Sequence, residues 1–162
     1  MDTNVPIVAN GRPDPSRGGH QPSIDCRKAA VMRLMTLMAT GTVVLDLAGE
    51  IEDEYQRHLN PSGQPGVGDR FFLQVINSAP GRIERANLPL SASGDYEDFP
   101  TDPALVNFDH SDRKFAALSR REGIPVVTAT DSDWVEHRDA LVANAVAIDF
   151  VCGCDRANWF AS

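Results

Sequence analysis

Helical patterns that alternate with short apolar or β-branched runs constrain the fold of this chain most strongly. Residues spaced as on one face of a helix cover 27–40, 47–59, 69–78, 112–122 and 132–144. Runs typical of strands cover 5–9, 42–45, 124–128 and 146–151, with an ambiguous edge strand at 82–88. Strands separated by helices run parallel and are covered on both faces. The pattern predicts a three-layer α/β/α fold with a mostly parallel central sheet.

Length and composition indicate one soluble domain spanning residues 1–162. The chain is 42% hydrophobic and 23% charged, which is ordinary for globular proteins. The most apolar helical stretch, 29–39, is interrupted by Arg33, so we expect no transmembrane segment. Asp2 stands where a secretory signal would carry basic residues, which favours a cytoplasmic protein with no membrane partner.

The net charge and the cysteine content restrict the kinds of function that this chain can have. The net charge of -8 argues against nucleic-acid binding through overall positive charge, although a local basic strip is compatible with it. The three cysteines are an odd number without the spacing of a disulfide framework. They point to a reducing compartment. The pair Cys152 and Cys154 is too closely spaced for a common zinc site.

Two aspartates fall where a parallel sheet usually binds its ligands, beyond the carboxyl ends of the strands. Asp131 follows the strand expected at 124–128, where it can either cap the next helix or bind a ligand. Asp112 lies on the same helical face as the apolar residues 115 and 116, so it is expected to point inward. A capping box with Asp109 is the structural alternative for Asp112.

Further acids come from two other segments. Glu52 and Glu54 flank the apolar stripe of the helix expected at 47–59, and periodicity does not choose between them. Asp2 and Asn4 precede the first apolar run, where a frayed terminus is the alternative. Together with Asp112 and Asp131, these positions suggest carboxylates that converge at one edge of the sheet. Such a cluster needs divalent cations, and its hard oxygen ligands suit Mg²⁺ or Mn²⁺.

The order of four short segments then points to a known family. The segments are Asp2-Thr3-Asn4-Val5, Glu54-Tyr55, Asp112-Arg113-Lys114-Phe115-Ala116 and Val127-Thr128-Ala129-Thr130-Asp131-Ser132-Asp133-Trp134. This ordered set resembles the signature of the PIN-domain family. The resemblance spans nearly the whole chain and implies a single PIN-like domain over 1–162.

The resemblance implies a metal-dependent endoribonuclease that hydrolyses RNA phosphodiester bonds. Asp2, Glu54, Asp112 and Asp131 would form an acidic quartet that binds Mg²⁺ or Mn²⁺. Asp133 would be an auxiliary metal ligand, while Asn4 and Thr128 would orient the ligands. Substrate phosphates would be held by basic residues, with candidates at Arg12, Arg17, Arg113 and Lys114. Many family members are toxins with a cognate antitoxin, and dimers are common, so an antitoxin and a homodimer are also implied.

The sequence departs from the family pattern at its start. An apolar strand normally precedes the first aspartate, whereas only Met1 precedes Asp2 here. Either the true start lies upstream, or the first strand is shortened to the run at 5–9. The second acid is also open, because Glu50 lies one turn from Glu54 on the same side of the helix.

Two other functions compete with the nuclease. A PIN-like module that has lost activity would bind a protein partner and no Mn²⁺. A phosphatase-like hydrolase would use an aspartate nucleophile and form an aspartyl-phosphate. The second hypothesis ranks lower, because the chain lacks an Asp-x-Asp on a strand near its start.

Overall fold

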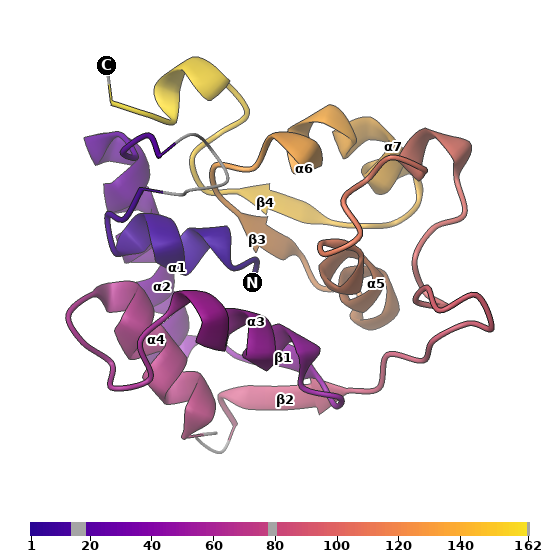
Figure 1. Cartoon of the computed structure of the whole chain (residues 1–162), viewed down its shortest axis with the longest axis horizontal. Helices are drawn as coiled ribbons and strands as arrows, with labels where there is room; N and C mark the ends of the chain where they lie inside the picture. The colour runs from indigo at the N-terminus through magenta and orange to yellow at the C-terminus, as the bar shows by residue number, and fades with distance from the viewer. Residues whose placement is uncertain (14–18, 78–80, 162) are drawn as a thin grey trace.

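Two short parallel strand pairs form the centre of the fold. The computed structural model describes residues 1–13, 19–77 and 81–161. Strand β1 (Val43–Asp46) pairs with β2 (Ile83–Ala86), and β3 (Val126–Thr128) pairs with β4 (Ile148–Phe150). Figure 1 shows the two pairs apart, with the N-terminus between them. The mixed α/β class with parallel strands is confirmed, and within the described residues the strands form two small sheets.

Apart from α1, the helices fall in the stretches that the sequence pattern predicts to be helical. The helices are α1 (Asn4–Ala9), α2 (Ile24–Thr40), α3 (Glu50–His58), α4 (Val67–Ile76), α5 (Arg113–Glu122), α6 (Ser132–Glu136) and α7 (Arg138–Ala143), with 3₁₀ turns at Pro103–Leu105 and Arg156–Asn158. Helix α1 packs against α2 and α4, and α5 packs against β3. In the described part of the chain, no helix has both the length and the apolar character needed to cross a membrane.

A continuous apolar core joins the two strand pairs. Leu45 of β1 and Val126 of β3 belong to the same cluster of buried side chains as Tyr55, Phe115 and Trp134. Trp134 and Phe115, which the sequence places in the core, are 0% and 2% exposed. Full burial of each such apolar side chain contributes about 1.5–3 kcal/mol to folding. The core therefore holds the loops between the strands and helices in fixed positions.

The apolar run at 5–9 is part of a helix, so its interpretation as a strand is wrong. The main-chain N–H of Asp2 donates to the carbonyl of Val127 at 2.9 Å, and the chain then turns into α1. Pro6 stands in the first turn of this helix, where its missing N–H is not needed for an intrahelical bond. The sequence signal failed here because five apolar residues are too few to separate the two periodicities.

Several helix boundaries also differ from the predictions. The helix expected from residue 47 begins at Glu50, because Asp46 at the end of β1 accepts hydrogen bonds from the N–H groups of Glu50 and Ile51 at 2.8 and 2.9 Å. The helix expected over 132–144 is divided at His137 into α6 and α7. The helix expected over 69–78 is observed as Val67–Ile76, and position 78 lies outside the described residues.

Two of the three cysteines are paired in the structure, which their number and spacing in the sequence do not indicate. Cys26 of α2 and Cys152, which follows β4, form a disulfide, and Cys154 is the remaining free thiol. The paired positions are 126 residues apart, so no local spacing in the sequence could indicate the bond. The cysteines therefore give no support to a reducing compartment.

Candidate metal centre

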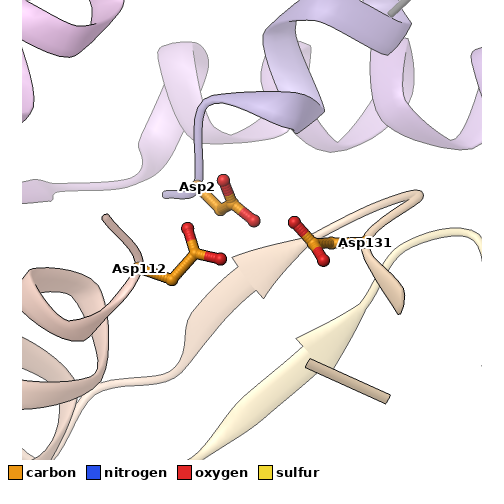
Figure 2. Close-up of side chains that lie close together, drawn as sticks. All are labelled: Asp2, Asp112 and Asp131. Atoms are coloured by element: carbon orange, nitrogen blue, oxygen red, sulfur yellow. The ribbon is translucent and has the colours of Figure 1, made fainter. Parts of the chain in front are cut away.

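Three buried aspartates from separate segments lie together at the carboxyl end of β3. Asp2, Asp112 and Asp131 each offer one carboxylate oxygen, and these oxygens all lie within 4.8 Å of one another. Figure 2 shows the three carboxylates directed toward a common point. Asp2 precedes α1, Asp112 precedes α5, and Asp131 lies between β3 and α6. Their side chains are almost fully buried, with residue exposures of 3%, 7% and 6%.

Asp2 is fixed to β3 through both its main chain and its side chain. Its N–H donates to Val127, the middle residue of β3, and its Oδ2 accepts a hydrogen bond from the hydroxyl of Thr128 at 2.8 Å. The side-chain amide of Asn4 donates to the same Oδ2 at 2.6 Å. Two donors on one oxygen orient this carboxylate and stabilise its charged form.

Asn4 connects Asp2 with the loop that carries Asp131. Its Oδ1 accepts from the N–H of Ala129 at 2.9 Å, which determines the direction of its amide group. Its Nδ2 then lies 3.4 Å from Oδ2 of Asp131. Asn4 and Thr128 thus both donate to the same carboxylate oxygen of Asp2.

Asp112 stands at the N-cap position of α5, but its carboxylate makes no capping hydrogen bond. The capping box with Asp109 is not formed, since Asp109 instead accepts from the N–H and hydroxyl of Ser111, both at 2.8 Å. The carboxylate of Asp112 therefore faces the aspartate cluster rather than its own helix. A buried carboxylate that is not used as a cap is typical of a functional site.

Asp131 caps the next helix with one carboxylate oxygen and turns the other toward the aspartate cluster. Its Oδ1 accepts from the N–H of Asp133 at 2.9 Å and caps α6. Its Oδ2 is directed toward Asn4 and the other two aspartates. The helix cap thus orients the carboxylate and leaves one oxygen at the cluster.

The electrostatics of the cluster favour a bound cation. Burial, followed by the charge of Asp131, raises the pKa of Asp2 from 3.8 to about 7. Burial, followed by the charges of Asp2 and Asp131, raises the pKa of Asp112 from 3.8 to about 10. Asp112 therefore holds its proton at neutral pH and Asp2 is only partly ionised, unless a positive charge replaces these protons. A divalent cation supplies that charge, and its hard oxygen donors are the type that Mg²⁺ and Mn²⁺ prefer.

Glu54 lies beside the cluster and is neutralised by protein groups. The hydroxyl of Thr3 donates to its Oε1, and the ammonium of Lys114 forms an ion pair with its Oε2. Its charge also contributes to the raised pKa of both Asp2 and Asp112. The sequence interpretation missed the Thr3 contact and the ion pair, because no local pattern connects α3 with α5. Lys114, expected at the substrate, is buried in this pair.

Glu50 and Asp133 are directed elsewhere. Glu50, the alternative to Glu54, accepts a hydrogen bond from the hydroxyl of Tyr96. The Oδ2 of Asp133 accepts from the N–H of Asp109 at 2.6 Å, and its Oδ1 lies 3.2 Å from Nδ1 of His137. Of the two glutamates, Glu54 is therefore the one beside the aspartates.

The other described basic residues expected to hold substrate phosphates form ion pairs within the protein. Arg113 forms an ion pair with Asp95 and lies over the ring of Phe99, 4.7 Å from its centroid. Arg12 pairs with the buried Asp69 at 3.0 Å. Arg17 lies outside the described residues. A phosphate role for Arg113 or Arg12 would require these ion pairs to open.

Comparison with known proteins found no relative of this chain. No protein-family model matches the chain, and neither a curated protein nor a solved structure is significantly similar to it.

Proposed function

We propose that this protein is a metal-dependent endoribonuclease with a PIN-like, three-layer arrangement. The observation that carries the proposal is the group of three buried aspartates, from three chain segments, whose oxygens lie within 4.8 Å of one another. Burying three carboxylates together is costly for a purely structural site, because each loses hydration and repels the others. A function that needs the charges explains why they are present.

The donor set fits one or two Mg²⁺ or Mn²⁺ ions, with Asp2, Asp112 and Asp131 as ligands and Glu54 as the adjacent fourth acid. A bound ion would lower the pKa of a coordinated water and stabilise the charge that develops on phosphate oxygens. Asn4 and Thr128 hold the Asp2 carboxylate in one orientation. The N–H of Asp133 does the same for Asp131.

The choice of RNA as substrate follows from the resemblance and from the charge of the site. A phosphodiester is repelled by a net charge of -8, so a metal centre is the natural place for its anionic group. Lys114 lies next to this centre and could pair with a phosphate once Glu54 binds metal. We further propose that the protein acts as the toxin of a toxin–antitoxin pair and forms a homodimer, as the family resemblance implies.

Cleavage of a labelled single-stranded RNA tests the proposal. The wild-type chain, Asp112→Asn and Asp131→Asn are compared in Mn²⁺, Mg²⁺ and EDTA. Asp53→Asn is the matched control, because Asp53 is an exposed acid of α3. We expect metal-dependent cleavage by the wild type and the control, and none by the two site variants. Folded wild-type protein that binds Mn²⁺ but cuts no RNA would contradict the nuclease, and failure to bind Mn²⁺ would favour the interaction module.

A further inference from the structure

Lys114 brings a buried positive charge to the fourth acid of the site. Its ammonium forms an ion pair with Oε2 of Glu54, and the hydroxyl of Thr3 donates to Oε1 of the same carboxylate. Both oxygens of Glu54 are therefore engaged with protein donors. Within the described residues, the acids placed to hold an ion together are the three aspartates, and Glu54 is not among them. The ion pair thus separates the fourth acid from the other three.

Protein groups fix the ammonium of Lys114 in place. Lys114 lies in the first turn of α5, two positions after Asp112, and its side chain is only 8% exposed. Its Nζ also donates to the carbonyl of Ser111 and lies 4.9 Å from the centroid of the Phe115 ring. A carboxylate, a carbonyl oxygen and an aromatic face all stabilise an ammonium that has lost its water. This positive charge is therefore a fixed part of the structure.

A divalent ion at Glu54 would compete with this ammonium. Mg²⁺ lies about 2.0–2.1 Å from the carboxylate oxygens that bind it. An ion ligated by Oε2 of Glu54 would therefore contact Nζ of Lys114, which pairs with the same oxygen. The two like charges would repel strongly, because the surroundings are buried. Moving the ammonium aside would leave it without the carboxylate that compensates its burial.

We propose that Lys114 is a built-in cation of the metal centre, so that the three aspartates bind one divalent ion and Glu54 binds none. The inference rests on the proposed metal centre, whose donor set alone admits one ion or two. In two-metal nucleases, a second ion stabilises charge on the attacking and leaving oxygens. Here the ammonium of Lys114 supplies positive charge beside the aspartates in place of a second ion. Removal of this ammonium should open Glu54 to a second divalent ion.

Counting the Mn²⁺ ions that the metal-free protein binds tests this inference. Titration calorimetry near pH 7.5 gives the stoichiometry, and electron paramagnetic resonance separates an isolated Mn²⁺ from a spin-coupled pair. Lys114→Met keeps a long side chain but removes the charge, whereas Lys114→Arg keeps the charge. Lys28→Met is the matched control, because Lys28 is the other lysine of the chain and is exposed.

We expect one isolated Mn²⁺ in the wild type, in Lys114→Arg and in Lys28→Met. Lys114→Met should bind a second, spin-coupled ion about 10–100-fold more tightly than any second ion binds the wild type. Adding Glu54→Gln to Lys114→Met should abolish the second site. The counts in the wild type and in Lys114→Arg test the inference even if Lys114→Met does not fold.

Two outcomes would overturn this inference and leave the metal centre in place. They are two ions bound to the wild type, and a single ion bound to folded Lys114→Met. The absence of Mn²⁺ binding by folded wild type would overturn the metal centre and the role of Lys114 together.

Discussion

Replacing Asp112 by asparagine should change how the stability of the metal-free protein depends on pH. The substitution keeps the size of the side chain but removes a titrating group whose pKa is about 10 in the fold and 3.8 ordinarily. Between these values the folded state keeps a proton that the unfolded chain has released. The contribution of Asp112 to the free energy of unfolding is fully present below pH 3.8. It is lost as pH rises toward the pKa of the folded state, because the unfolded state then binds fewer protons than the folded state.

The size of the effect follows from the proton difference. One retained proton lowers the free energy of unfolding by about 1.4 kcal/mol for each pH unit. Between pH 5 and pH 7, the wild type should therefore lose up to about 3 kcal/mol more than Asp112→Asn does. Asp2, whose pKa is about 7 in the fold, adds a similar loss to both proteins in this range and largely cancels in the comparison.

Urea unfolding in EDTA at pH 5, 6 and 7 measures this difference. Asp53→Asn serves as the control, because it makes the same chemical change at an exposed carboxylate outside the aspartate cluster. The free energy of unfolding of Asp112→Asn should rise relative to that of the wild type at each higher pH. Parallel pH profiles for wild type and Asp112→Asn would refute the account of a buried, proton-holding cluster.

Three further changes test other parts of the structure. Asn4→Ala removes the donor to Asp2 at 2.6 Å and should weaken Mn²⁺ binding about 10–100-fold, measured by calorimetric titration; unchanged affinity would show that Asn4 does not orient the ligand. Lys114→Met removes the buried cation that pairs with Glu54 and should lower the free energy of unfolding of the metal-free protein by about 3 kcal/mol, measured in urea. Mn²⁺ should reduce this loss, and an equal loss with and without Mn²⁺ would argue against a role of Glu54 at the metal. Cys152→Ser should lower the free energy of unfolding by about 2–5 kcal/mol under oxidising conditions and by little in reductant, and an effect independent of reductant would contradict the disulfide.

The sequence predicts the parallel α/β class. It also predicts the positions of three of the four proposed acids, Asp2, Asp112 and Asp131. Asp112 shares a helical face with Phe115 and Ala116, and periodicity alone predicts that it points inward. Asp131 follows a β-branched run and lies at the carboxyl end of a parallel strand. The convergence of Asp2 with these two was suggested by the motif order rather than by any local pattern.

Long-range contacts explain what the sequence could not predict. The choice of Glu54 over Glu50 depends on Thr3 and Lys114 on one side and on Tyr96 on the other. The helix at 5–9 depends on the pairing of Asp2 with β3, which turns the chain before Val5. The disulfide joins residues separated by 126 positions. In each case the deciding partner is distant in the chain, and periodicity carries no information about it.

Binding of Mn²⁺ to the metal-free protein is the most direct test of the central claim, that the three aspartates form a metal centre. Titration calorimetry or electron paramagnetic resonance would compare the wild type, Asp112→Asn, Asp131→Asn and the control Asp53→Asn near pH 7.5. The account predicts saturable binding of one or two ions by the wild type and the control, with release of protons as the raised carboxyl groups ionise. Both site variants should lose at least tenfold in affinity. Equal Mn²⁺ binding by all four proteins, or none by folded wild type, would contradict the claim.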